Sequence, residues 1–310
     1  GGITGRQIAL IFEDSQADPK IGVSVVQKLI RVNKVPAVIG DLISSVTLAI
    51  APIVNANEVV LLSPASSSPE ITNAGDYVFR NCPSDTYEGT VMANYVIGKT
   101  NIKNVAILCV NNDYGLGIKS VFIKHFKGQG GTVTIQETFE QNGTDFRSQL
   151  TKIAEGTPDA VYLVGYKEMG HILKQAKELG IKAQFLSTVL FEDPEILKIA
   201  GGAANGVIYS ASAFDVKSQD KVVQAFVDSY RNKYGAEPDV FSALSYDSMK
   251  ILCEALKETI IDGKHIRNAL CALKDYRGVM GTISFDTNGD VVLSPVMKQV
   301  QDGKFVFLSQ

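Results

Sequence analysis

Short apolar runs alternate along most of this chain with longer segments in which apolar side chains recur at the helical period. This alternation predicts a repeat of strands and helices, and therefore an α/β fold. Nearly continuous apolar runs such as Val105 to Val110 indicate parallel strands that are covered on both faces. The expected strands are Gln7 to Phe12, Ala37 to Ile39, Val59 to Leu62, Val105 to Val110, Thr132 to Gln136, Ala160 to Val164, Gln184 to Leu186 and Gly206 to Ser210.

The helical segments carry start signals. Asp18 and Pro19 begin the first helix as cap and first-turn residue, and Ser44 is expected to cap a helix from Ser45 to Asn55. Further helices are predicted at Thr86 to Gly98, Gly115 to Lys127, Asp145 to Ala154, Glu168 to Leu179, Ser218 to Tyr234, Val240 to Glu258 and Ile266 to Leu273.

The last part of the chain changes character. Gly278 to Phe285, Val296 to Val300 and Phe305 to Leu308 read as short strands, joined by the turn pairs Asn288-Gly289 and Asp302-Gly303. Because the earlier strand-helix units fill two sheets, these late elements complete one lobe after the chain has visited the other. Several crossings between two lobes form a hinge.

Length, composition and charge exclude several classes of function. The 310 residues are 45% apolar and 20% charged, which is typical of a packed protein, and a length above about 300 residues favours two lobes. The net charge is −3 and the Lys and Arg residues are dispersed, so the sequence predicts no basic surface of the kind that binds nucleic acid. The cysteines have no C-x-x-C spacing, so no zinc site is predicted; a disulfide between Cys253 and Cys271 is a hypothesis that thiol titration before and after reduction would test.

No catalytic, cofactor or metal motif is present. The chain has no G-x-S-x-G elbow, Walker loop or H-E-x-x-H helix, and its three histidines lie apart. Glu192-Asp193 precedes Pro194, where Asp193 as a helix cap accounts for the pattern. The sequence therefore predicts a protein that is not an enzyme.

Four loops that follow strands carry hydroxyl and aromatic side chains. Ser44 and Ser67 each present a hydroxyl and backbone amides at a helix start, a setting that suits a carboxylate. Tyr114 and Tyr166 follow strands of the second group and are expected to approach the same ligand. Taken alone, the stretch Ser63 to Ser68 is better explained as an ordinary loop whose hydroxyls cap the next helix at Pro69.

Several sequence motifs resemble those of one protein family, and they occur in the same order along the chain. They are Gly2-Ile3-Thr4-Gly5-Arg6-Gln7-Ile8, Glu13 to Pro19, Ser63 to Thr72, Asp113-Tyr114-Gly115-Leu116-Gly117 and Phe285 to Asp290. They are similar to the type I periplasmic binding proteins that serve branched-chain amino acid ABC transporters. The resemblance implies two Rossmann-like lobes with mostly parallel sheets and three hinge crossings, one lobe being 1–83 with 213–295 and the other 84–212 with 296–310.

The resemblance also implies a ligand site between the lobes. Ser44 and the loop Ala65, Ser66 and Ser67 are expected to hold the ligand's carboxylate and ammonium from the first lobe, with Phe241 at the apolar end. Tyr114 and Tyr166 are expected to approach from the second lobe.

Three departures from the family pattern stand out. Val189 occupies the position of the glutamate that pairs with a ligand ammonium, so either Glu192 or Asp85 supplies that charge or the ligand is not an α-amino acid. The family's disulfide is absent, with Ala17 and Ile43 at its two positions. The family's first strand and helix are expected to be missing before Gly1.

The leading hypothesis is an extracytoplasmic solute-binding protein that captures an amino acid or related small carboxylate by lobe closure and delivers it to an ABC transporter permease. It needs no cofactor, and export would use a signal peptide that this chain does not contain. The alternative is a sensory receptor domain of the same fold, which would signal to a partner. A neighbouring permease gene or a fused output domain would separate the two.

Overall fold

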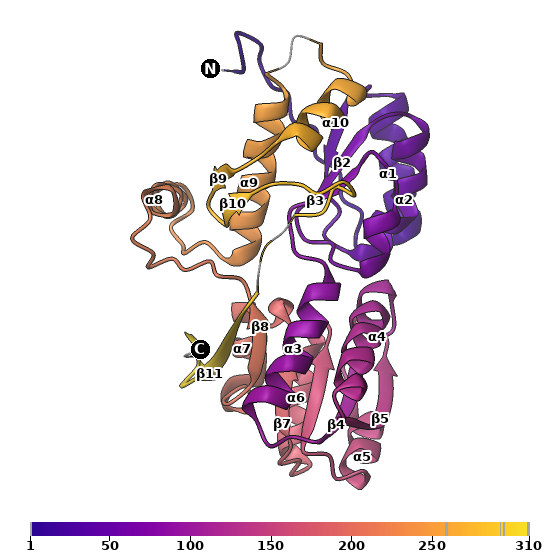
Figure 1. Cartoon of the computed structure of the whole chain (residues 1–310), viewed down its shortest axis with the longest axis vertical. Helices are drawn as coiled ribbons and strands as arrows, with labels where there is room; N and C mark the ends of the chain where they lie inside the picture. Colours follow the sequence, from indigo (N-terminus) through magenta and orange to yellow (C-terminus); the bar gives the residue numbers. More distant parts are fainter. Residues whose placement is uncertain (1, 258–259, 292, 294, 309–310) are drawn as a thin grey trace. The chain divides into compact units, whose positions relative to one another are not determined.

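The computed structural model describes residues 2–257, 260–291, 293 and 295–308 (Figure 1). The chain divides into two compact units. Unit 1 comprises Gly1–Ser84 and Phe214–Leu293, and unit 2 comprises Asp85–Ala213 and Ser294–Gln310. Glu258, the expected end of a late helix, lies outside the described residues.

Unit 1 is built on a parallel sheet in the order β1 (Ala37–Ile39), β2 (Val60–Ser63) and β3 (Val78–Arg80). The side chains of β2 alternate between two cores. Leu61 packs in a cluster with residues of α1 (Pro19–Arg31) and α2 (Ser44–Ala56). Val60 and Leu62 pack in a second cluster, with residues of α9 (Val240–Ala255) and α10 (Gly263–Ala272). The period of two therefore buries both faces of the strand.

The remaining elements of unit 1 follow the serine-rich loop or come late in the chain. They are η1 (Pro69–Asn73), α8 (Lys221–Tyr234), α9 (Val240–Ala255), α10 (Gly263–Ala272) and the antiparallel pair β9 (Tyr276–Gly278) and β10 (Gly281–Ile283). Asp18, Asp220, Asp239 and Asp262 each accept a hydrogen bond from a first-turn amide of the helix that they precede.

Unit 2 holds a larger sheet in the order β12-β11-β8-β7-β6-β4-β5. The pairs from β5 to β8 are parallel, and β11 pairs antiparallel with both β8 and β12. The strands are β4 (Asn104–Val110), β5 (Thr132–Phe139), β6 (Ala160–Val164), β7 (Gln184–Ser187), β8 (Ile208–Ala211), β11 (Val296–Gln301) and β12 (Lys304–Phe307). The expected turn Asp302-Gly303 joins β11 to β12.

The helices of unit 2 form two groups, α3 with α4 and α5 with α6 and α7 (Figure 1). Their bounds are α3 (Asp85–Lys99), α4 (Asp113–Gly128), α5 (Arg147–Glu155), α6 (Glu168–Glu178) and α7 (Pro194–Ala200), with short 3-10 turns at η2 (Val189–Phe191) and η3 (Gly201–Ala203). The strands β4 and β6 are almost fully buried, as their continuous apolar runs predict.

Three sequence expectations are wrong in detail. Gln7 to Phe12 is not a strand; no described strand pairs with it, and Leu10 and Phe12 are exposed. An isolated extended segment has no ladder of hydrogen bonds to hold it. Cys253 and Cys271 are separate thiols rather than a disulfide. Ser44 is the first residue of α2 instead of its cap, which is Ile43.

Within the described ranges, no helix is both long and apolar enough to cross a membrane.

Candidate functional site

The stretch Ser63 to Ser68, here called the serine loop, follows β2 in unit 1. The Ser63 hydroxyl donates to the Asp41 carbonyl at 2.6 Å and accepts from the Ser66 amide at 2.9 Å. The Ser66 hydroxyl lies 2.8 Å from the same carbonyl and 2.7 Å from the Thr47 hydroxyl. Ser68 caps η1 by accepting from the Glu70 amide. These hydroxyls shape the loop, and the predicted capping role is confirmed for Ser68.

Two other serines keep donors available. The Ser44 hydroxyl accepts from the Ser68 amide at 3.1 Å, which leaves its own proton to donate. Within the described ranges, the Ser67 amide and hydroxyl make no hydrogen bond. The cap residue of α2, Ile43, offers no side-chain acceptor to the first amides of that helix. Hydroxyl donors beside an uncapped helix start form a setting for an anion.

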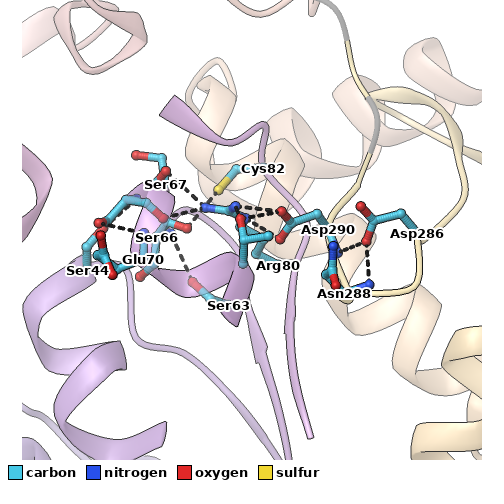
Figure 2. Close-up of polar contacts among 12 residues, drawn as sticks. Ser44, Ser63, Ser66, Ser67, Glu70, Arg80, Cys82, Asp286, Asn288 and Asp290 are labelled. Carbon is cyan, nitrogen blue, oxygen red and sulfur yellow. Dashed lines mark hydrogen bonds and ion pairs between the residues drawn. The ribbon is translucent and has the colours of Figure 1, made fainter. Parts of the chain in front are cut away.

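Arg80 lies between the serine loop and Asp290 (Figure 2). The Arg80 guanidinium is fully buried and forms an ion pair with Asp290. It also donates to the carbonyls of Ser67 and Ser68 at 2.9 and 2.8 Å. No sequence motif pointed to Arg80. The partners are 210 positions apart, so no local pattern relates them.

Phe241, the expected apolar wall, lies in the first turn of α9. It is half-buried and packs against a small cluster of Cys82, Val240 and Leu244. The Cys82 thiol in turn donates to the Ser66 carbonyl at 3.4 Å. Phe241 is therefore connected to the serine loop through Cys82.

The two predicted tyrosines are neighbours in unit 2. Their ring centroids lie 5.6 Å apart. Tyr114, near the start of α4, is buried and its hydroxyl lies 2.7 Å from the Thr188 hydroxyl. Tyr166 follows β6, is half-buried, and accepts from the Asn112 amide group at 3.2 Å. Burial raises the pKa of Tyr114 well above its ordinary value, so the phenol stays neutral.

A buried acid, Glu88 of α3, holds the segment that carries Val189. One carboxyl oxygen of Glu88 accepts from the Val189 amide and from the Ser210 hydroxyl, both at 2.5 Å. Burial raises the pKa of Glu88 to about 7, and hydrogen bonds from Ser210, Val189 and Asp85 oppose that shift. The Val189 amide is thus occupied by the protein itself. Glu88 was not among the predicted site residues. The only local signal for it is its spacing of three positions from Asp85, which places both acids on one face of a helix.

The two acids proposed to replace the family's glutamate have partners inside unit 2. Glu192 forms an ion pair with Lys298 of β11 at 2.5 Å, and both side chains are largely buried. Asp85 is fully buried and shares a hydrogen bond with Glu88. Val189 itself is half-buried and apolar.

No group of three or more metal-ligating side chains occurs among the residues that the structure describes.

Comparison with known proteins identifies the family of this chain. A family model described as periplasmic binding protein matches residues 1–303. The chain belongs to this family. Among its relatives, a Leu/Ile/Val-binding protein homolog of Brucella abortus is 28% identical, over 100% of this chain and 84% of that protein.

Solved structures agree. The branched-chain amino acid transporter substrate-binding protein LivJ of Streptococcus pneumoniae, in complex with isoleucine, is 32% identical with a TM-score of 0.90, covering 98% of this chain and 87% of that one. A solute-binding protein of an ABC transporter from Rhodopseudomonas palustris, in complex with 3,4-dihydroxybenzoic acid, is 25% identical with a TM-score of 0.86, covering 99% and 86%. These relatives are binding proteins rather than enzymes, and the α/β fold with a mostly parallel sheet is confirmed.

Proposed function

We propose that this periplasmic binding protein captures a small carboxylate for an ABC importer. The observation that carries the proposal is the set of available donors in unit 1, namely the Ser44 hydroxyl and the Ser67 amide and hydroxyl beside the start of α2. A carboxylate is stabilised by several converging donors and by the positive end of a helix. The family membership and the ligands named for the relatives support the same role.

The proposed ligand has an apolar remainder and no α-ammonium group. An ammonium that leaves water requires an acidic partner, and a half-buried Val189 cannot supply one. Glu192 is engaged by Lys298, and Asp85 has no exposed surface at which it could meet an ammonium group. Phe241 in unit 1 and the rings of Tyr114 and Tyr166 in unit 2 suit an aliphatic or aromatic body.

Transport follows from ligand-induced closure in this proposal. A ligand that touches Ser44 in one unit and Tyr166 in the other favours a closed state, because it gains contacts there that the open state lacks. The closed protein then delivers the solute to a membrane permease from the extracytoplasmic side. The chain passes between its units three times, which suits such a hinge.

The test is a calorimetric titration with L-leucine and 4-methylpentanoate, which is leucine without its ammonium group. We expect 4-methylpentanoate to bind at least about tenfold more tightly, since a buried ammonium without a counter-ion costs over ~1.4 kcal/mol. Benzoate and 3,4-dihydroxybenzoate extend the series, and 4-methylpentanamide serves as the uncharged control. Tighter binding of leucine would refute the ammonium-free ligand. No detectable binding of any of the carboxylates would refute the carboxylate site.

A further inference from the structure

Arg80 places all of its donors on acceptors within unit 1. A guanidinium has five N–H groups. Two reach the Asp290 carboxylate at 2.6 and 2.7 Å, one reaches the Thr72 hydroxyl at 2.7 Å, and two reach the carbonyls of Ser67 and Ser68. The side chain has no exposed surface. Its orientation is therefore set by all five bonds together.

Asp290 orients the guanidinium from the opposite side. Its two oxygens take a bidentate pair from Arg80, and the second also accepts from the Thr72 hydroxyl at 2.8 Å. The backbone amides of Asn288 and Asp290 both donate to one oxygen of Asp286, which shapes the turn that presents the Asp290 carboxylate (Figure 2). Bidentate geometry gives the ion pair direction as well as charge.

The bonds to the serine loop determine where its amides point. In a trans peptide unit the carbonyl of one residue and the amide of the next point in opposite directions. Arg80 holds the Ser67 carbonyl, so the Ser68 amide of the same unit points away from Arg80, toward the Ser44 hydroxyl that accepts it. Cys82 holds the Ser66 carbonyl in the same way, so the Ser67 amide points away from Cys82.

We propose that Arg80, oriented by Asp290, is a positioning residue for the carboxylate site. By holding the Ser67 and Ser68 carbonyls it keeps the Ser68 amide on the Ser44 hydroxyl, and this leaves the Ser44 proton directed to the ligand. Arg80 does not touch the ligand; its charge is neutralised by Asp290 and it acts through the loop. This inference rests on the proposed carboxylate ligand.

The binding experiment uses the full chain with the double substitution Arg80→Met and Asp290→Leu. Removing both charges keeps the net charge unchanged, and replacing a buried ion pair by apolar residues together is often neutral for folding. The probes are the carboxylate–amide pairs 4-methylpentanoate with 4-methylpentanamide, and L-leucine with L-leucinamide. We expect carboxylate affinity to fall about thirtyfold and amide affinity by less than about threefold, because a lost hydrogen bond to a charged group is the larger loss.

The carboxylate-to-amide ratio separates positioning from a merely structural role. If the pair only supported the fold, part of the protein would be incompetent and both affinities would fall by the same factor. An unchanged ratio overturns the inference. Should the double variant not fold, Arg80→Lys replaces it, because lysine keeps the charge but not the fork that reaches both carbonyls; a wild-type ratio in Arg80→Lys also overturns the inference.

Two controls separate this inference from the proposed function. Ser44→Ala removes the direct donor, with Ser45→Ala as its matched neighbour. If Ser44→Ala lowers the carboxylate-to-amide affinity ratio and the double variant does not, the carboxylate site stands and the role of Arg80 is refuted. If Ser44→Ala keeps the ratio, the proposed site itself is wrong.

Amide hydrogen exchange tests Arg80 without any ligand. The Ser68 amide should exchange about tenfold faster in the double variant, while the Leu61 amide, bonded to the Tyr77 carbonyl within the sheet, should keep its rate. An unchanged Ser68 rate would refute the positioning role even if no probe bound the wild-type protein.

Discussion

The serine loop of unit 1 and the Val189 segment of unit 2 are held by buried groups of opposite chemistry. Beside the serine loop, the Arg80 guanidinium donates hydrogen bonds to the carbonyls of Ser67 and Ser68, so the donors of the loop stay available for other partners. Beside Val189, the Glu88 carboxyl group accepts a hydrogen bond from the Val189 amide, so that donor is already used. Under the proposed function, unit 1 supplies the hydrogen-bond donors to a carboxylate, and unit 2 supplies aromatic and apolar surface.

The second of these anchors, Glu88, responds to pH. Glu88, with its pKa raised to about 7 by burial, changes charge within the physiological range. The comparison can therefore be sharpened by removing each anchor and by titrating the second.

The largest effect is expected from Arg80→Met alone. It leaves the Asp290 carboxylate buried without its partner, which costs about 3 to 5 kcal/mol of unfolding free energy. Urea unfolding followed by circular dichroism measures the loss. Arg277→Met is the matched control, because the Arg277 side chain is exposed and an ion pair at the surface contributes little to stability. Equal losses in the two variants would contradict a special role for the buried anchor.

A smaller effect is expected from pH acting on Glu88. Its folded pKa of about 7 lies above the ordinary 4.5, so between these values the folded state keeps a proton that the unfolded state releases. The Glu88 contribution to the free energy of unfolding therefore falls as pH rises from about 4.5 to about 7, by roughly 3 kcal/mol in all, and is level above.

Glu88→Gln isolates that contribution. The variant keeps an acceptor for the Val189 amide and does not titrate. Comparing the urea midpoints of the two proteins at pH 5 and pH 8 gives the slope due to Glu88. A wild-type slope no steeper than that of Glu88→Gln would show that the acid titrates as if exposed.

The smallest effect is expected from Tyr114→Phe. This change removes the hydroxyl that pairs with buried Thr188, next to Val189, and costs about 1 kcal/mol of stability. Tyr166→Phe, the control, removes a longer bond from a half-buried residue and should cost less than about 0.5 kcal/mol. The melting temperatures of the two variants measure these losses. A larger loss in Tyr166→Phe than in Tyr114→Phe would leave Glu88 as the main anchor of this segment.

Local patterns were enough for much of the fold. Apolar runs located β4 and β6, Asp-Pro located the start of α1, and Asp302-Gly303 located the β11–β12 turn. Gln7 to Phe12 shows the limit of such patterns. Its apolar residues favour a strand, but a strand exists only where another strand bonds to it.

For the candidate site, the sequence by itself indicated the residue types and the loops, including Ser44, Ser67, Tyr114 and Tyr166. Each follows a strand, and that is a local property of the chain. Only the tertiary structure decided which donors remain available. Arg80 meets Asp290 across 210 positions, and Glu88 meets Val189 across 101. Hydrogen bonds at such separations depend on how the elements pack, and no local period encodes them.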